Sequence, residues 1–118
     1  MRVNIISNKK TKEKENLKEL IKVEVKNQFK KVDFKESKVI TSISKNELYI
    51  IFVDDNSLLE KLEINYNKNS IIIITTTIKV EYIQKLINYA NTLYYIKTDK
   101  NMIIYEVLKK CSDINVKC

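Results

Sequence analysis

The stretch IIFVDD, residues 50–55, decides how the whole chain is interpreted. Four apolar residues run directly into Asp54 and Asp55, which is the pattern of a buried strand that ends at a polar site. The segment Leu48–Val53 is therefore predicted to be a strand covered on both faces. Strands of this kind occur in parallel sheets, where a helix usually carries the chain from one strand to the next. The flanking sequence is thus expected to alternate between strands and helices.

Strand-like and helix-like segments do alternate outward from this stretch. The predicted strands are Arg2–Ile6, a half-exposed segment around Val32 and Phe34, Leu48–Val53, the segment SIIIITTT that starts at Ser70, and Leu93–Ile96. The predicted helices are Thr11–Phe29, a piece that starts at Ser57, Val80–Tyr89 and Met102–Cys111. Residues 38–46 suit a short helix or a strand, and the helix is preferred. This order predicts a doubly wound α/β fold, with a five-stranded parallel sheet and helices on both faces.

The length of the chain predicts one domain, residues 1–118. A chain of this size can bury roughly two-thirds of its unfolded surface in a single core. Apolar runs such as Ile71–Ile74 are far shorter than the ~20 residues that a membrane-spanning helix needs. The N-terminus also lacks the pattern of a secretory signal. A cytoplasmic protein with no membrane partner is expected.

Several residue types are missing, which argues against common chemistries. The chain has no histidine, glycine or proline, and its two cysteines are Cys111 and Cys118. Zinc binding is disfavoured, since structural zinc sites combine several cysteine or histidine ligands. A disulfide between the two cysteines would close only a short terminal loop, which argues against a structural role. Without histidine or a glycine-rich phosphate loop, an enzyme is the least favoured class.

The net charge of +7 allows an anionic partner such as nucleic acid. All but one of the 22 basic residues are lysine, however, which an AT-rich coding sequence would produce by itself. Recognition of bases and phosphates commonly recruits arginine, so nucleic acid is the alternative partner and not the preferred one. The lysines that would serve it are Lys9, Lys10, Lys12, Lys14, Lys30 and Lys31.

Polar residues follow the predicted strands at the edge where binding sites form in parallel sheets. Asp54 follows the third strand, Thr75 closes the fourth and Lys97 follows the fifth. A carboxylate, a hydroxyl and an ammonium group together can handle a phosphoryl group. The carboxylate acts as nucleophile or metal ligand, and the other two groups bind phosphoryl oxygens. Each residue also has a simpler interpretation, as the point where a buried strand meets water.

This layout resembles a response-regulator receiver domain over nearly the whole chain. The first residues, MRVNIISN, are similar to the opening strand of that family. The phosphoacceptor position of the family falls on Asp54 in YIIFVD. Its hydroxyl position falls on Thr75 in IIIITT, and its lysine position falls on Lys97 in YYIKTD. Tyr94 or Tyr95 lies near the aromatic switch position of the family, although the two tyrosines also suit one ring on each face of the strand. The resemblance implies a flavodoxin-like (βα)5 fold with Asp54 as phosphoacceptor and Thr75 and Lys97 as ligands of the phosphoryl oxygens.

The chain departs from the family at three places. The acidic pair that holds a divalent cation is replaced by Ser7 and Asn8, the segment after Asp54 is shorter, and the proline after the lysine is Thr98. Because two carboxylates are lost, we expect no cofactor or a weakly bound Mg²⁺ with Asp54, Asp55 and Asn8 as possible ligands. Asp55 has an alternative and favoured role in the first turn of the following helix.

The resemblance implies a stand-alone, atypical receiver-like domain of bacterial two-component signalling, with weak or absent phosphorylation. It would act by binding a histidine kinase, a downstream regulator or a second copy of itself. The surface for this would be the helix 4, strand 5, helix 5 face of the family, here Val80–Tyr89, Tyr94 and Asn101–Lys110. Two alternatives remain: a basic nucleic-acid-binding module, and another small α/β fold such as an anti-sigma-factor antagonist, which would not explain Asp54, Thr75 and Lys97.

Overall fold

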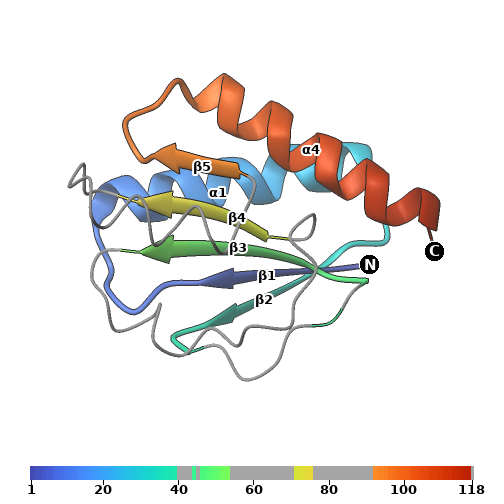
Figure 1. Cartoon of the computed structure of the whole chain (residues 1–118), viewed down its shortest axis with the longest axis horizontal. Coiled ribbons are helices and arrows are strands. Elements are labelled where there is room, and N and C mark those ends of the chain that lie inside the picture. Colours follow the sequence, from blue (N-terminus) through green and yellow to red (C-terminus); the bar gives the residue numbers. More distant parts are fainter. Residues whose placement is uncertain (40–43, 45, 54–70, 76–91, 118) are drawn as a thin grey trace.

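The computed structural model describes residues 1–39, 44, 46–53, 71–75 and 92–117, which form five strands and two helices (Figure 1). In chain order the elements are β1 (Arg2–Ile6), α1 (Lys12–Gln28), β2 (Asp33–Ser37), β3 (Leu48–Val53), β4 (Ile71–Thr75), β5 (Thr92–Tyr95) and α4 (Lys100–Lys117). All five predicted strands are confirmed, and β1 and β3 have the predicted bounds. The described part of the chain is therefore an α/β fold.

The five strands form one parallel sheet with the order β2-β1-β3-β4-β5 (Figure 1). The chain adds β2 on one side of β1 and then returns to add β3, β4 and β5 on the other side. All carboxyl ends consequently lie at the same edge of the sheet, to which the strand arrows in Figure 1 point. The strand order reverses between β1 and β3, the position where parallel sheets open a crevice for ligands.

The central strands are buried on both faces, as the sequence predicts. One face packs against both helices and contributes Val3, Ile5, Leu48, Ile50, Phe52, Ile72 and Ile74 to the main core. The alternating residues of the same strands are buried as well; they include Ile6, Tyr49, Ile51, Val53, Ile71 and Ile73. Because side chains alternate between the two faces of a strand, both faces of the sheet centre are shielded from water.

Helix α1 begins where the sequence supplies a cap. Thr11 has extended backbone geometry, and its hydroxyl oxygen accepts a hydrogen bond from the backbone N–H of Lys14 at 3.2 Å. Glu13 and Glu15 in the first turn favour the positive end of the helix dipole. The apolar residues Leu17, Leu20, Ile21 and Val25 recur at helical spacing and predict one buried stripe; Leu17, Ile21 and Val25 are buried, whereas Leu20 is half-buried.

Helix α4 is longer than predicted. It runs from Lys100 to Lys117, whereas the apolar pattern predicted Met102–Cys111. Its start is set by Asp99, whose carboxylate accepts a hydrogen bond from the N–H of Asn101 at 2.9 Å. Its buried stripe continues past Cys111 to Ile114. The helix packs against α1, so both described helices cover the same face of the sheet (Figure 1).

The predicted helices from Ser57 and at Val80–Tyr89, most of the ambiguous stretch 38–46, and Cys118 lie outside the described residues. Neither described helix is long and apolar enough to cross a membrane. Cys111 is a free cysteine in the core, and burial raises the pKa of its thiol to about 12. A thiol in this environment behaves as a small apolar side chain.

Candidate functional site

The candidate site lies at the carboxyl edge of the sheet, where the sequence predicts it. Val53 of β3 is paired with Thr75 of β4, which is in turn paired with Tyr95 of β5. Ile6, the last residue of β1, is paired with Ile51 of β3. Strand β1 therefore ends two residues short of the row formed by Val53, Thr75 and Tyr95. The predicted phosphoacceptor Asp54 and its neighbour Asp55 lie outside the described residues. The strands β1, β3, β4 and β5 are each described to their last residue, and the residues that follow are described for β1 and β5.

The end of β1 is held by hydrogen bonds of Ser7. Its backbone N–H donates to the carbonyl oxygen of Ser37 at 3.0 Å, which extends the β1–β2 pairing by one residue. Its hydroxyl donates to the carbonyl oxygen of Lys9 at 2.8 Å, which bends the loop toward α1. Asn8 follows and is half-buried. At the place where receivers carry two carboxylates, the chain thus has a neutral hydroxyl and a neutral amide.

This donor set fits a divalent cation poorly. Mg²⁺ prefers anionic oxygen ligands in octahedral geometry, and the end of β1 offers a hydroxyl that is already bonded and a neutral amide. Within the described ranges, no group of three or more Asp, Glu, His or Cys side chains is arranged to hold a metal. Of the possible ligands Asp54, Asp55 and Asn8, the structure describes Asn8 alone.

The ends of β4 and β5 bring Thr75 and Lys97 to the same edge. The side chain of Thr75 is buried, and its carbonyl oxygen accepts a hydrogen bond from the N–H of Ile96 at 2.9 Å. Ile96 was predicted as the last residue of the strand, but it forms this bond at the start of a turn, so β5 ends at Tyr95. Lys97 lies in this turn with its side chain exposed.

Thr98 closes this turn with two hydrogen bonds. Its backbone N–H donates to the carbonyl oxygen of Tyr95 at 2.9 Å, and its hydroxyl oxygen accepts from the N–H of Tyr95 at 3.2 Å. No peptide bond in the described residues is cis. A proline at this position could not donate the first of these bonds, so the turn that presents Lys97 is built differently from the receiver pattern.

The two predicted switch aromatics are both half-buried on β5. Tyr94 packs against the main core beside α4. Burial raises the pKa of its phenol, and the nearby negative charge of Glu106 acts in the same direction. Since consecutive side chains point to opposite faces, Tyr95 lies on the other face, as the simpler interpretation of the pair predicts.

The most exposed apolar side chains of α4 were not singled out from the sequence. Met102 is 55% exposed and Tyr105 is 68% exposed, and they lie three residues apart on the same side of the helix. Their exposure could have been predicted from the sequence, because neither residue lies on the buried stripe formed by Ile103, Val107 and Cys111. These two residues belong to the predicted interaction segment Asn101–Lys110.

Two lysines of α1 are buried, and one of them, Lys14, was predicted to bind nucleic acid, so that prediction is corrected for Lys14. Lys14 is 0% exposed, and its ammonium group donates to the carbonyl oxygen of Lys9 at 3.2 Å. Lys14 therefore cannot reach a phosphate backbone in this fold. Lys18 is also buried, with its Nζ 2.9 Å from Oε1 of Glu15 and 3.5 Å from Oε1 of Glu36. Both lysines lie on the stripe that continues through Ile21, so helical spacing alone would have placed them inside.

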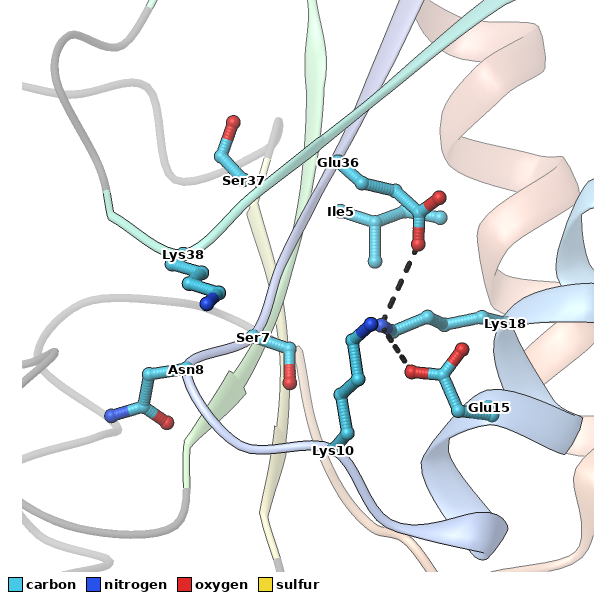
Figure 2. Close-up of a pocket in the computed structure, with 9 residues that line it drawn as sticks. All are labelled: Ile5, Ser7, Asn8, Lys10, Glu15, Lys18, Glu36, Ser37 and Lys38. Atoms are coloured by element: carbon cyan, nitrogen blue, oxygen red, sulfur yellow. Dashed lines mark hydrogen bonds and ion pairs between the residues drawn. The ribbon is translucent and has the colours of Figure 1, made fainter.

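A cavity of about 480 Å³ opens beside the ends of β1 and β2, against the first turns of α1. Three lysines and two glutamates are among its lining residues: Lys10, Lys18, Lys38, Glu15 and Glu36. Figure 2 shows the three amines directed into one space from the loop, from α1 and from the end of β2. Sequence analysis did not bring these residues together, because they come from three different elements.

No protein-family model and no curated protein sequence matches the chain. Among solved structures, the chain is similar to a protein described as a CpaE2 pilus assembly protein from Sinorhizobium meliloti 1021, with a TM-score of 0.57, 16% identity, and coverage of 94% of this chain and 99% of the other. A hypothetical protein from Methanococcus jannaschii, whose structure inferred a 3-hexulose-6-phosphate isomerase function, has a TM-score of 0.49, 14% identity, and coverage of 98% and 70%. At such identities the first likeness shows a shared fold alone, a parallel α/β sheet.

Proposed function

We propose that the chain is an atypical receiver-like domain that acts in signal transduction by binding another protein, with weak or absent phosphorylation of Asp54. The observation that carries this proposal is the shared edge of β4 and β5, where the buried hydroxyl residue Thr75 lies next to the turn that presents Lys97. A hydroxyl and an amine at neighbouring strand ends are the groups that would bind phosphoryl oxygens on Asp54.

The proposal includes a doubly wound, flavodoxin-like arrangement with helices on both faces of the sheet. The strand order β2-β1-β3-β4-β5 supports it, because this is the order of doubly wound folds that bind ligands beside β1 and β3. The burial of both sheet faces gives independent support. We further propose a bacterial, cytoplasmic protein whose role is binding and not catalysis.

Weak phosphorylation follows from the residues at the end of β1. Ser7 and Asn8 add no negative charge there, and the Ser7 hydroxyl is already bonded to Lys9. Phosphoryl transfer to a carboxylate depends on positive charge that neutralises the phosphoryl oxygens, and in receivers a metal supplies most of it. The described donors fit Mg²⁺ poorly, which leaves the exposed Lys97 as a solvated cation at this edge.

The interaction surface would combine β5 with the exposed side of α4. Met102 and Tyr105 present an apolar and an aromatic side chain there, and aromatic residues are enriched at protein interfaces. The partner would be a histidine kinase, a downstream regulator or a second copy of the chain.

Nucleic acid is less well supported. Lys14 is buried, and the remaining predicted lysines form two groups, at Lys9–Lys12 and at Lys30 and Lys31. These groups flank opposite ends of the 17-residue helix α1, which separates them by roughly 25 Å. They therefore do not form one continuous basic patch.

The intact mass of the protein after incubation with acetyl phosphate and Mg²⁺ tests the phosphorylation claim. We expect the wild type to gain phosphate on at most a small fraction of molecules, and Asp54→Asn to gain none. Complete modification of the wild type at Asp54 would refute weak phosphorylation. Equal modification of the wild type and Asp54→Asn would show that the phosphate is attached to a residue other than Asp54.

Sedimentation analysis over a range of concentrations tests the surface. If the partner is a second copy, Tyr105→Ser should weaken self-association, whereas Val23→Ser, which removes an exposed apolar side chain of α1, should leave it unchanged. A chain that is monomeric at every concentration would exclude the homodimer and leave a different protein as the partner. Equal weakening by both variants would argue against the α4 surface.

A further inference from the structure

The cavity beside the ends of β1 and β2 has the size of a small-molecule site. Its volume of about 480 Å³ falls in the usual range for such sites, roughly 300–1,000 Å³. It lies at the β2 end of the sheet edge, and neither Thr75 nor Lys97 is among its lining residues. Ser7 and Asn8 also line it, so the cavity adjoins the end of β1 but does not include the phosphoryl-binding residues at the ends of β4 and β5.

The carboxylates of the cavity are already engaged. Glu15 pairs with the buried Lys18 at 2.9 Å. Glu36 pairs with Lys18 at 3.5 Å through one oxygen and with Lys22 at 2.8 Å through the other. A cationic ligand would have to displace a lysine that is fixed by its burial. The negative groups thus serve to hold Lys18 and are not available to bind a cation.

Two further lysines line the cavity and form no ion pair with a carboxylate of the described residues. Lys10 in the β1–α1 loop and Lys38 after β2 are exposed, and neither forms an ion pair with another described residue. Figure 2 shows them entering the cavity from different elements. Ser37 lines the same wall, but Figure 2 shows its hydroxyl directed away from the two amines. Two amines that come from different elements make a set of donors for an anion.

We propose that this cavity binds a small phosphorylated organic molecule, with its phosphate group between Lys10 and Lys38. A phosphate monoester carries up to two negative charges near neutral pH, which matches the two amines that lack a carboxylate. Lysine binds phosphate as a point charge and does not require the planar geometry of arginine, which this region lacks. The cavity is larger than inorganic phosphate needs, and the remaining space accommodates the organic part of the ligand.

Titration of the wild-type protein with adenosine 5′-monophosphate, followed by amide chemical shifts in NMR, tests this site. Adenosine, which lacks the phosphate group, and inorganic phosphate, which lacks the organic part, are the two control ligands. We expect saturable shifts at Ser37, Lys38 and Lys10 with the monophosphate and none with adenosine. Lys10→Gln and Lys38→Gln should each weaken binding at least about fivefold, as expected for a charge-assisted contact. Lys31→Gln removes an exposed lysine outside the cavity and should change binding less than about twofold.

Several results would overturn the proposal. Equal binding of adenosine would show that the phosphate group is not recognised. Equal weakening by Lys31→Gln would mean a general attraction to the positive protein. Weakening by Lys97→Gln, with Lys10→Gln and Lys38→Gln unaffected, would place the phosphate at the phosphoryl edge of β4 and β5. Absence of saturable shifts with both the monophosphate and inorganic phosphate would exclude an anion site at the cavity.

Discussion

The Nζ atom of Lys22 on α1 lies 2.8 Å from Oε2 of Glu36 on β2. The hydrogen bond from Lys22 is the main reason why the pKa of Glu36 is lowered, and it also raises the pKa of Lys22. The other carboxylate oxygen of Glu36 faces the buried Lys18 at 3.5 Å. One side chain of the edge strand thus holds two cations of α1, although β2 buries little apolar surface of its own.

Replacing Glu36 with Gln should lower the free energy of unfolding at neutral pH by about 0.5–1 kcal/mol, a value kept small because the Glu36 side chain is half-exposed. Since its folded-state pKa lies below the ordinary value of 4.5, the contribution is full above that pH and is lost as the pH falls through the lowered pKa. Urea unfolding across this range should show the wild type and Glu36→Gln converging in acid, with Glu24→Gln as the control. A constant difference at all pH values would contradict this assignment.

Replacing Thr11 with Ala should destabilise the protein by about 0.5–2 kcal/mol, because the N–H of Lys14 loses its acceptor at the start of α1. Thr11→Ser keeps the hydroxyl and should retain most of the stability. Thermal and urea unfolding of both variants provide the measurement. If serine costs as much as alanine, the methyl group and not the cap is responsible.

Replacing Thr98 with Pro should destabilise the turn after β5 by about 1 kcal/mol or more, since the carbonyl oxygen of Tyr95 loses the N–H donor that lies 2.9 Å away. Thr98→Ala keeps this donor and loses only the hydroxyl acceptor, so its cost should be smaller. The free energies of unfolding of the two variants decide between these roles. A proline variant as stable as the alanine variant would show that the turn accommodates the receiver-like residue.

Cys111 should resist thiol reagents in the folded protein. Its thiol is buried and its pKa of about 12 leaves almost no thiolate at about pH 8. The test uses Cys118→Ser, which leaves Cys111 as the single cysteine. Modification should be complete in denaturant and negligible without it. Rapid modification of the native variant would mean that the core between α1 and α4 opens readily.

The strands could be predicted from sequence more closely than the helix ends. The segments Arg2–Ile6 and Leu48–Val53 consist largely of apolar residues that the sheet buries, so composition alone fixes their bounds. The end of the last helix was underestimated because polar residues follow Cys111, although Ile114 continues the buried stripe three residues later. Its start depends on a hydrogen bond from Asn101 to Asp99, which apolar periodicity does not report.

The site could be predicted only where it depends on strand ends. Thr75 and the turn with Lys97 lie together because parallel strands finish at one edge, a rule that sequence order is enough to apply. The burial of Lys18 was missed, because a lysine is ordinarily assigned to the surface. Its carboxylate partners are Glu15, one turn earlier in α1, and Glu36, which is eighteen residues away along the chain and is brought near by the pairing of β1 with β2. A contact of this kind becomes visible only after the fold is known.

The strand order also bears on how the chain is made. After β2, each new strand joins the same growing side of the sheet, first β3 on β1, then β4 and β5 in the order of synthesis. Each described strand after β1 therefore finds its neighbour already synthesised, and none of the five described strands has to insert between two others. Helix α4 comes last and packs beside α1 over the apolar residues of the sheet. Without α4, the core residues that it covers beside α1 would be exposed to water, and exposed apolar surface promotes aggregation during folding.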